Sequence, residues 1–477
     1  MFSAKRFSRR THGGPQWVLI TAKRLYSGSN AKLRDRVAIL SLVLILYTVI
    51  IGTKPLQIKV STAAAVDGDP VRQMIYLGVT ALLIWASQVH RKPARLIPFP
   101  LLISLLLLWC LITISWSAVP DIAIRRLLLT YIVMWSIFRS VDEIGYTRAV
   151  AVLRIGLAAA LVANFLAVAL SPVAVHQVNE LADPKLVGNW RGFLPHKNWA
   201  GPLCSVTIIM FLFDTQLLLG RKRIAQVLVL LGSVFFLYKT QSKTSMNLLG
   251  LSITLGFLFQ RYNPTYRVLL ISAAATLAMA AVVFVNTYRD KLLAPFWGSD
   301  RTVLTGRVDI WPLLIEYWRD HPFGAGFGSF WKVGPESPIN YYTASWVAGI
   351  GNGHNGYLDL LVTIGWPGLL LAILATVALP LWRLMMSTKV SRGARGMLMA
   401  LLIFCVAQNG TETSLLDRDM LMQVFFMLSL ALIYEAARFG DVRPPAFAWS
   451  EMKQGLAQSH TSRQVQTAAR IREHEQE

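Results

Sequence analysis

Apolar residues follow one another in twelve long runs that occupy most of this chain. A helix needs about 20 apolar residues to cross the roughly 30 Å hydrocarbon core of a bilayer, and although several runs are shorter, most approach that length. The pattern predicts an all-α polytopic membrane protein with about 12 transmembrane helices. The predicted spans are residues 37–53, 74–89, 97–116, 122–138, 151–170, 197–219, 224–238, 244–260, 268–286, 356–381, 396–408 and 420–437.

The polar interval between the ninth and tenth runs, residues 287–355, breaks this pattern. It is rich in glycine, aromatic residues and charge, which indicates a large water-facing loop. Within it Val308, Trp311, Ile315 and Trp318 recur at steps of three and four, so we expect an amphipathic helix that carries these residues on one face. A long ordered loop of this kind is usually functional, and it could close a pocket at the membrane surface.

Two polar ends flank the membrane part. Residues 1–36 form a basic arm, and residues 438–477 form a polar tail that we expect to be flexible. Between these ends, residues 37–286 are predicted to hold transmembrane helices 1–9, and residues 356–437 to hold helices 10–12 after the large loop. The arm is expected to lie in the cytoplasm against anionic lipid.

Composition changes this picture mainly through charge. The chain has 477 residues, of which 54% are hydrophobic and 15% charged, with a net charge of +22. In a soluble protein that excess would suggest nucleic acid, but here membrane topology explains it, because Lys and Arg favour cytoplasmic loops. With the amino terminus inside, every inner loop carries at least two Lys or Arg, and both termini are cytoplasmic. The cysteines, Cys110, Cys204 and Cys405, all fall within apolar runs, which argues against a disulfide framework.

Positive charge at the outer face opposes the topology rule and therefore needs a reason. Four outer stretches combine basic residues with a flexible turn or a helix start, where an anion is favoured. A side chain snorkelling to the lipid headgroups is the alternative for each of them. The residues are Arg191, His196 and Lys197 within residues 189–201, Lys243 within residues 239–245, Arg307 at a helix start, and His354 with Asn355 before the tenth run; Glu412 lies on the same face.

Metal ligands are suggested only weakly. Asp67 with Asp69, and Asp417 with Asp419, form two outer Asp-x-Asp pairs, where chance alone would give roughly 0.5, which is a weak signal. No His, Asp and Glu cluster has compelling ligand spacing. We therefore expect no metal and no other cofactor.

Four short motifs occur in a fixed order: RGFLPHKN, GRVDIW, HPFGAGFGSFW and HNGYLDLLVTIGWPGLLL. Together they resemble the O-antigen ligase/polymerase superfamily and, within it, bacterial exopolysaccharide polymerases. In that superfamily outer-face arginines bind the diphosphate of a polyprenyl-linked oligosaccharide, and a histidine at the end of the large loop is the proposed base. The matching positions here are Arg191, Arg307 and His354. Lys243 stands where many members have arginine, and a lysine keeps the charge but loses the bidentate fork.

The resemblance implies a metal-independent, inverting glycosyltransferase of the bacterial inner membrane. It would polymerise polyprenyl-diphosphate-linked oligosaccharide repeat units at the periplasmic face in exopolysaccharide biosynthesis. Cations would stabilise the leaving diphosphate in a partly dry pocket, and the imidazole of His354 would take the acceptor proton. The diphosphate-binding residues are then Arg191, Arg307, Lys243 and Lys197, and His196, Asn355 and Glu412 are secondary candidates for the site.

Partners follow from the same reading. We expect the lipid-linked oligosaccharide, the growing polysaccharide and membrane lipids, with flippase and chain-length or export proteins beside them, and no nucleic acid. Two alternatives stay open. An O-antigen ligase that moves glycan to a lipid A core or another acceptor needs the same donor site. A polysaccharide or lipid-linked sugar transporter or flippase would also hold basic cavity residues, but should show broken midplane helices or an internal repeat, and no clear repeat is visible.

Overall fold

The computed structural model describes residues 29–53, 55–56, 69–178, 186–213, 220–261, 264–266, 272, 276 and 306–440. Over these residues the chain is helical, without a strand, and has one isolated antiparallel bridge, between Val175 and Trp190. The predicted all-α class is therefore confirmed. Most of the basic arm, almost all of the ninth predicted span and the tail after Gly440 lie outside the described residues.

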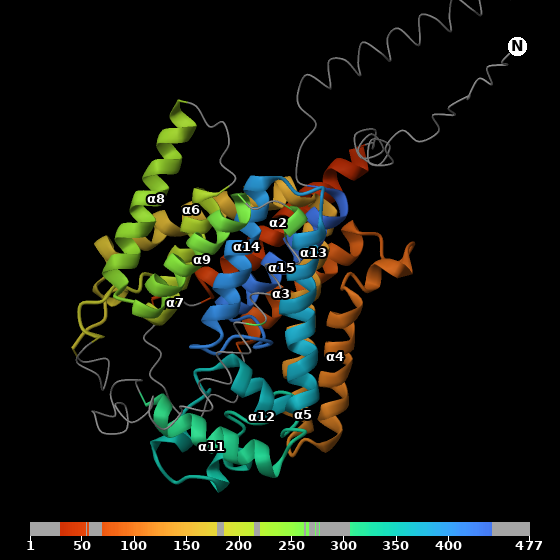
Figure 1. Cartoon of the computed structure of the whole chain (residues 1–477), viewed down its shortest axis with the longest axis vertical. Helices are drawn as coiled ribbons and strands as arrows, with labels where there is room; N and C mark the ends of the chain where they lie inside the picture. Colours follow the sequence, from red (N-terminus) through yellow and green to blue (C-terminus); the bar gives the residue numbers. More distant parts are fainter. Residues whose placement is uncertain are drawn as a thin grey trace, which may run out of the picture. The chain divides into compact units, whose positions relative to one another are not determined.

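Each predicted apolar run inside the described residues forms a helix (Figure 1). A π turn (Leu374–Ala378) joins the two helices of the tenth run. The helices are α2 (Ser29–Ile50), α3 (Pro70–Ala86), α4 (Leu101–Thr113), α5 (Pro120–Ile144), α6 (Tyr146–Leu170), α7 (Lys197–Leu212), α8 (Arg221–Thr240), α9 (Lys243–Arg261), α12 (Gly356–Ile373), α13 (Leu379–Met386), α14 (Arg392–Gln408) and α15 (Leu421–Phe439).

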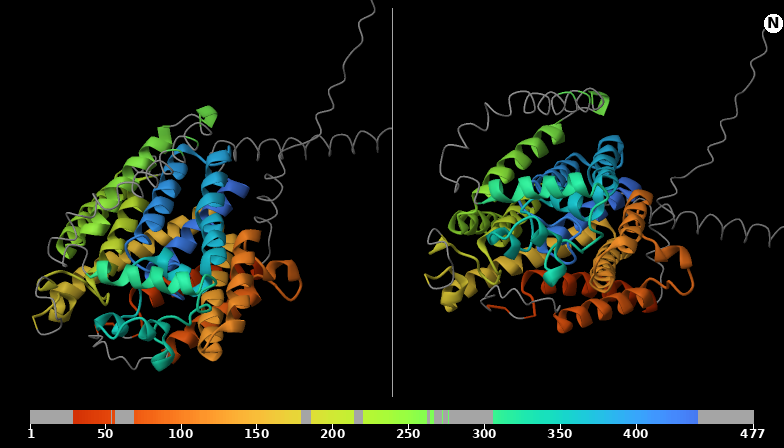
Figure 2. Two further views of the ribbon diagram at one scale, coloured as in Figure 1. Left: turned by 60° about the horizontal axis from the view of Figure 1, so that its bottom comes forward. Right: turned by 90° about the horizontal axis from the view of Figure 1, so that it is seen from below.

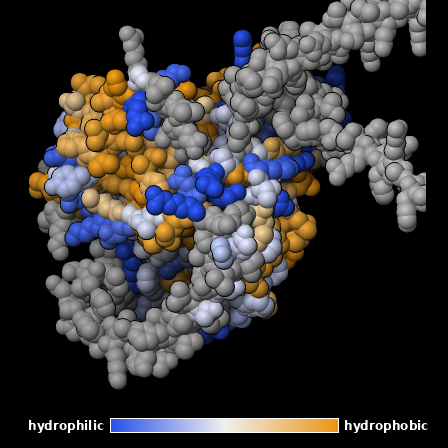
Figure 3. All heavy atoms as spheres, turned by 45° about the horizontal axis from the view of Figure 1, so that its top comes forward, coloured by the Kyte–Doolittle hydropathy of each residue, from blue (hydrophilic) through white to orange (hydrophobic). Residues whose placement is uncertain are grey.

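Four stretches among the described helices are long and apolar enough to cross a membrane: Tyr146–Leu170, Lys222–Thr240, Gly356–Met386 and Leu421–Phe439. Many large apolar side chains point outward, among them Leu170, which is 81% exposed. Figure 3 shows such side chains as a broad apolar area on one face of the molecule. Soluble proteins rarely expose so much apolar surface, whereas lipid tails cover it without cost. The chain is therefore a multi-pass membrane protein.

The other helices surround α15. Of the most apolar stretch of this helix, 83% is buried by the rest of the chain. On one side α14 packs along α9, and α7 packs against α8. On another side α4 and α5 run beside the long helix made by α12 and α13 (Figure 1).

The tenth predicted span, residues 356–381, is not one continuous helix. Gly365 has φ 69° and interrupts α12. A side chain at Gly365 would place its Cβ 2.5 Å from the Pro322 carbonyl oxygen and from the Phe323 Cα, so only glycine fits this close approach. The Trp366 amide donates to the Pro322 carbonyl at 3.1 Å. The break therefore fixes the large loop to the membrane helices, and it is a feature that the sequence pattern did not predict.

The amphipathic helix of the large loop is present as α11 (Arg307–Asp320), which lies across one end of the bundle (Figures 1 and 2). Its most buried residues are Ile310, Leu314 and Tyr317, whereas Ile315 of the predicted apolar face is 36% exposed. The rest of the loop folds back over α11, so tertiary contacts, and not the spacing of the largest side chains, select the face. A separate apolar core results, made of Ile310, Leu314, Tyr317, Phe330, Trp331, Ile339, Val347 and Val362.

Candidate functional site

Glu412, in the segment between α14 and α15, is the centre of a polar cluster. Its carboxylate accepts hydrogen bonds from Asn198 Nδ2 at 3.0 Å and from Arg307 Nη2 at 3.2 Å. The other carboxylate oxygen lies 3.2 Å from Nδ1 of His354. Residues from four distant parts of the sequence therefore converge on one carboxylate, and three of the outer stretches that the sequence marked separately form one site.

His354 is held firmly by its backbone and its ring. Its φ of 49° is a left-handed conformation that non-glycine residues seldom adopt, and such strain gathers at functional sites. The His354 amide donates to the side-chain oxygen of Asn352 at 3.1 Å. Because a carboxylate can only accept a hydrogen bond, Nδ1 of His354 carries the hydrogen and donates it to Glu412. In the neutral ring, Nε2 is then the acceptor nitrogen. The ring is 39% exposed, so a substrate can reach it.

Asn355 caps the helix that follows it. Its side-chain oxygen accepts hydrogen bonds from the amides of Tyr357 and Leu358, which makes Asn355 the N-cap of α12. Its own amide donates to the hydroxyl of Thr413 at 3.1 Å. Asn355 therefore fixes the backbone next to His354, and its contact with the ring or the sugar stays a prediction.

Arg307 is the first residue of α11, directly after the N-cap Gly306. Besides Glu412, its Nη2 contacts the carbonyl of Thr411 at 2.6 Å. Gly306 has φ 79°, and a Cβ there would lie 2.6 Å from the ring of Trp346. The guanidinium thus sits where the amides and dipole of α11 also favour an anion.

Arg191 is more deeply buried than a side chain that binds a diphosphate should be. Only 5% of it is exposed, and its Nε donates to the carbonyl of Val173 at 2.7 Å. In this structure the guanidinium therefore ties together the loop before α7. Direct contact between Arg191 and a ligand remains a prediction, and it needs that loop to open.

Two histidines lie side by side in this loop, with the ring centroids of His176 and His196 5.0 Å apart. His196 caps α7, because its Nδ1 accepts from the amide of Asn198 at 3.2 Å. Burial, followed by the nearby charges of His196, Arg191 and Lys197, lowers the pKa of His176 to about 4. Burial likewise lowers the pKa of His196, partly opposed by Glu412. Both rings are therefore neutral near pH 7 and add no charge to the site.

The two candidate lysines lie near the turn between α8 and α9. Lys197 Nζ donates to the carbonyl of Gln241 at 3.3 Å. Gln241 itself has φ 51°, so the turn is tight. Lys243, two residues later, is the first residue of α9 and is exposed. The structure therefore brings Lys197 to the turn that carries Lys243. Lys197 is also the residue before Asn198, which contacts Glu412.

Asn198 is the site residue that sequence reasoning missed. It is the last residue of the motif RGFLPHKN and directly follows the candidate Lys197 in the first turn of α7. That position was the only signal that the sequence offered. An amide side chain next to a lysine attracts no attention until its partner Glu412, 214 residues away, is in place. Long-range partners of this kind cannot be found from spacing alone.

The two aspartates of the second pair form ion pairs, whereas Asp69 of the first pair is the N-cap of α3. Asp417 accepts from Nε of Arg418 at 2.9 Å, and Asp419 pairs with Arg72 of α3. Asp67 lies outside the described residues. Among the residues that the structure describes, no three His, Cys, Asp or Glu side chains gather as metal ligands would.

The fold and the site define a class: a multi-pass membrane protein with an imidazole, a carboxylate and a guanidinium clustered at one end of its bundle. Residues 227–373 match the family model described as O-Antigen ligase, and this match supports the resemblance to the O-antigen ligase/polymerase superfamily. The matched segment holds Lys243, Arg307 and His354, whereas Arg191 and Glu412 lie outside it. No curated protein matches the chain.

The superfamily gives the cluster a chemical context. Its members are glycosyltransferase-like ligases and polymerases that act on lipid-linked oligosaccharides. An enzyme of this kind needs a base for the acceptor hydroxyl and cations for a leaving diphosphate. The Glu412 cluster contains one side chain of each type, in contact with the same carboxylate.

Proposed function

We propose that this protein polymerises polyprenyl-diphosphate-linked oligosaccharide repeat units during exopolysaccharide biosynthesis. The observation that carries the proposal is the shared carboxylate: Glu412 contacts both Nδ1 of His354 and Nη2 of Arg307. A base and a cation are thereby held at fixed positions near each other. Fixed geometry of this kind is what a transfer between two bound sugars requires.

The reaction is a direct displacement at the anomeric carbon of the donor. Nε2 of His354 takes the proton from the acceptor hydroxyl, whose oxygen attacks that carbon, and the bond to the lipid diphosphate breaks with its electron pair going to the diphosphate. Glu412 orients the ring and stabilises the imidazolium that forms, as carboxylates do in other acid–base clusters. Attack opposite the leaving group inverts the configuration at the anomeric carbon.

The leaving diphosphate needs cations more than it needs an acid, because it departs already stable but highly charged. Arg307 supplies a guanidinium at a helix N-terminus. A phosphate oxygen there is stabilised both by the guanidinium and by the amides of the first helical turn. Lys197, next to Asn198 of the cluster, and Lys243, in the turn that Lys197 contacts, can share the charge. Arg191 joins this set if its loop opens around the ligand.

The site belongs, in this proposal, at the periplasmic face of the bacterial inner membrane, with the twelve spans of the sequence pattern and both termini in the cytoplasm. The bias of Lys and Arg toward the inner loops supports that orientation. Lipid-linked repeat units delivered to the outer leaflet would then meet the cluster directly. No nucleotide is consumed, which suits a compartment without ATP.

The decisive experiment incubates the purified full-length protein, in lipid nanodiscs with EDTA present, with a lipid-linked repeat unit and sizes the products on a gel. A ladder of products establishes polymerisation. A single glycan added to a lipid A core supplied as acceptor would make the protein a ligase. Absence of any product would overturn the enzyme assignment in favour of transport, and activity restored only by a divalent ion would overturn the metal-free mechanism.

A further inference from the structure

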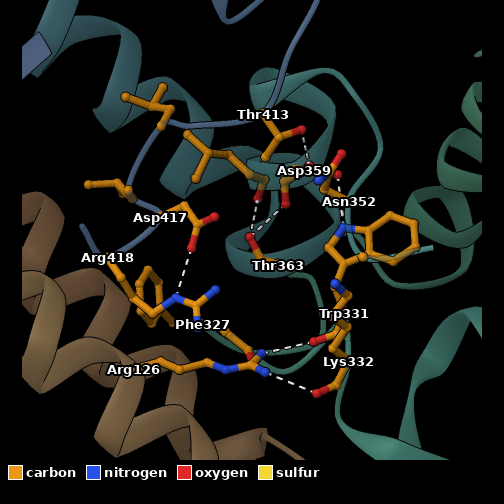
Figure 4. Close-up of a pocket in the computed structure, with 15 residues that line it drawn as sticks. Arg126, Phe327, Trp331, Lys332, Asn352, Asp359, Thr363, Thr413, Asp417 and Arg418 are labelled. Carbon is orange, nitrogen blue, oxygen red and sulfur yellow. Dashed lines mark hydrogen bonds and ion pairs between the residues drawn. The ribbon is translucent and has the colours of Figure 1, made fainter. Parts of the chain in front are cut away.

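A polar cavity of about 240 Å³ lies next to the Glu412 cluster (Figure 4). It is smaller than the roughly 300–1,000 Å³ clefts that hold drug-sized ligands, so it suits one sugar ring and not an oligosaccharide. In Figure 4 the side chains of Arg418 and Asp417 face Trp331 and Asn352 across it. Its lining includes Trp331, Asn352, Asp359, Thr363, Thr413 and Arg418.

The cavity borders the base but lies apart from the diphosphate cations. Glu412 and Thr413 are consecutive residues outside any helix, and their side chains have different partners. Glu412 contacts Arg307, whereas the hydroxyl of Thr413 donates to Asp359 in the cavity wall. Asn352, also in the wall, accepts the amide hydrogen of His354. In a direct displacement the acceptor and the leaving group stand on opposite sides of the anomeric carbon, and the cavity takes the acceptor side.

The cavity wall is a built structure held by a buried carboxylate. Asp359 is 6% exposed, and its Oδ1 accepts hydrogen bonds from Nε1 of Trp331 at 2.9 Å and from the amide of Gly353 at 3.0 Å. Together with the bond from Thr413, these contacts occupy its lone pairs. Asp359 therefore positions the wall and the His354 segment, and the remaining lining groups are available to a ligand.

Backbone strain gathers at the same place. Lys332, Leu416 and Arg418 all have positive φ, at 52°, 59° and 43°, and all three line the cavity. Such conformations cost of order 1–3 kcal/mol each and persist where the surroundings hold them for a purpose. With His354 beside the cavity, four of the seven non-glycine residues with positive φ in the described chain lie at this one place.

The charges of the lining indicate the ligand. Three cations, Arg126, Lys332 and Arg418, face two carboxylates, Asp359 and Asp417, which leaves one positive charge in excess. Arg418 is paired with Asp417, and the guanidinium of Arg126 donates to three main-chain carbonyls. Among the described residues the ammonium of Lys332 has no carboxylate at ion-pair distance, and its side chain is exposed. Hydroxyl and amide groups beside an uncompensated cation suit a polyhydroxylated ring that carries one carboxylate.

We propose that this cavity is the acceptor subsite and that it binds one acidic sugar of the growing chain, with the carboxylate of the sugar at Lys332. The proposal rests on the proposed function for the word acceptor, but the binding of an acidic sugar does not depend on it. Thr363 and Asn352 meet the ring hydroxyls. The subsite then sets which glycan end is extended, because a neutral sugar lacks the group that Lys332 recognises.

The test measures binding of D-glucuronate and D-glucose to the full-length protein in nanodiscs by saturation-transfer NMR, with no donor present. Lys332→Asn removes the charge and tolerates the positive φ, since asparagine is enriched in that region. The matched control is Arg319→Asn, an exposed cation of the same loop on α11. We expect glucuronate to bind at least fivefold better than glucose, Lys332→Asn to abolish that preference, and Arg319→Asn to keep it.

A second variant guards against a local folding effect. Thr363→Val removes a hydroxyl that donates only to carbonyls of its own helix, so the fold should be retained, and both sugars should bind more weakly. Absent binding of glucuronate, equal binding of the two sugars, or equal behaviour of Lys332→Asn and Arg319→Asn would each overturn the subsite. Sugar binding that follows Lys332 while the transfer assay yields no product would support the subsite and reject the proposed function. In an active enzyme, Lys332→Asn should raise the KM of the acceptor about tenfold and leave the KM of the lipid-linked donor unchanged.

Discussion

Nδ1 of His354 lies 3.2 Å from Oε2 of Glu412, although 58 residues separate the two in sequence. The contact decides which ring nitrogen can accept a proton from a substrate. The carboxylate accepts a hydrogen bond from Nδ1, so Nε2 is the unprotonated nitrogen of the neutral ring. It also places a negative charge where an imidazolium forms during proton transfer. A side chain that merely snorkels to the lipid headgroups would require neither consequence, so the pair makes specific predictions.

Replacement of His354 should abolish most of the turnover and preserve donor binding. A general base contributes typically 10²–10⁴-fold, so we expect His354→Asn to slow transfer by about that factor in the purified assay. Asparagine tolerates the φ of 49° better than alanine, which limits structural damage. The control is His321→Asn, because His321 is exposed at the end of α11 and stacks on Tyr317, away from Glu412. A near-normal rate in His354→Asn would remove this residue as the base.

Glu412 should act through His354 and Arg307 and not on the substrate alone. Glu412→Gln keeps the shape but loses the charge that favours the Nδ1-protonated ring, and we expect turnover to fall about 10- to 100-fold. Groups that act as a unit are non-additive, so the double variant with His354→Asn should be about as slow as His354→Asn alone. Fully multiplicative losses in the double variant would show that Glu412 works independently of the ring.

The sequence predicted the helical class and the apolar runs because a membrane span is a local pattern that needs only about 20 residues. It also marked Arg307 and His354, since unusual charge at the outer face is visible in one loop at a time. It did not predict Asn198 or the break at Gly365, because both depend on partners that only the fold brings near. The most buried residues of α11 were not identified for the same reason: residues that follow the helix cover Leu314 and leave Ile315 exposed.

Arg307→Lys should impair transfer strongly while the protein remains folded and membrane-inserted. The Nη2 group of the guanidinium contacts Thr411 and Glu412 at a helix N-terminus, and a lysine lacks the planar set of donors that can bind two phosphate oxygens at once. We expect at least a tenfold loss in turnover with lipid-linked donor. Arg319→Lys, on the exposed end of the same helix, should retain the wild-type rate. Equal losses in the two variants would contradict a specific phosphate role for Arg307.

Stability should fall on acidification because of His176. Burial lowers the pKa of this ring to about 4, below the ordinary value of about 6.5, so the folded protein favours the neutral form. The unfolded chain takes up a proton first as pH falls, so the stabilisation is complete above about pH 6.5 and is lost between there and about pH 4. The effect is on the order of 3 kcal/mol at most.

The measurement is a thermal melt of the detergent-solubilised protein at pH 7.5, 6 and 5. His176→Gln keeps an acceptor for the amide of Lys197, which now donates to Nε2 of His176 at 3.3 Å, but it cannot titrate. We expect the variant to show a flatter dependence of Tm on pH than the wild type. Parallel curves for the two proteins would assign the acid sensitivity to other groups.

Topology can be tested with the same chain, because the three native cysteines are buried and should react slowly with aqueous reagents. Ala344 lies exposed in the large loop, so Ala344→Cys should be labelled by a membrane-impermeant maleimide from the periplasmic side. Ser450→Cys, in the tail, should be labelled only after the inner membrane is permeabilised. The basis is the distribution of Lys and Arg among the loops, which favours inner-face positive charge. The reverse labelling pattern would place His354 and Arg307 on the cytoplasmic side. A lipid-linked donor in the outer leaflet could not reach them there, and the proposed reaction would be rejected together with the topology.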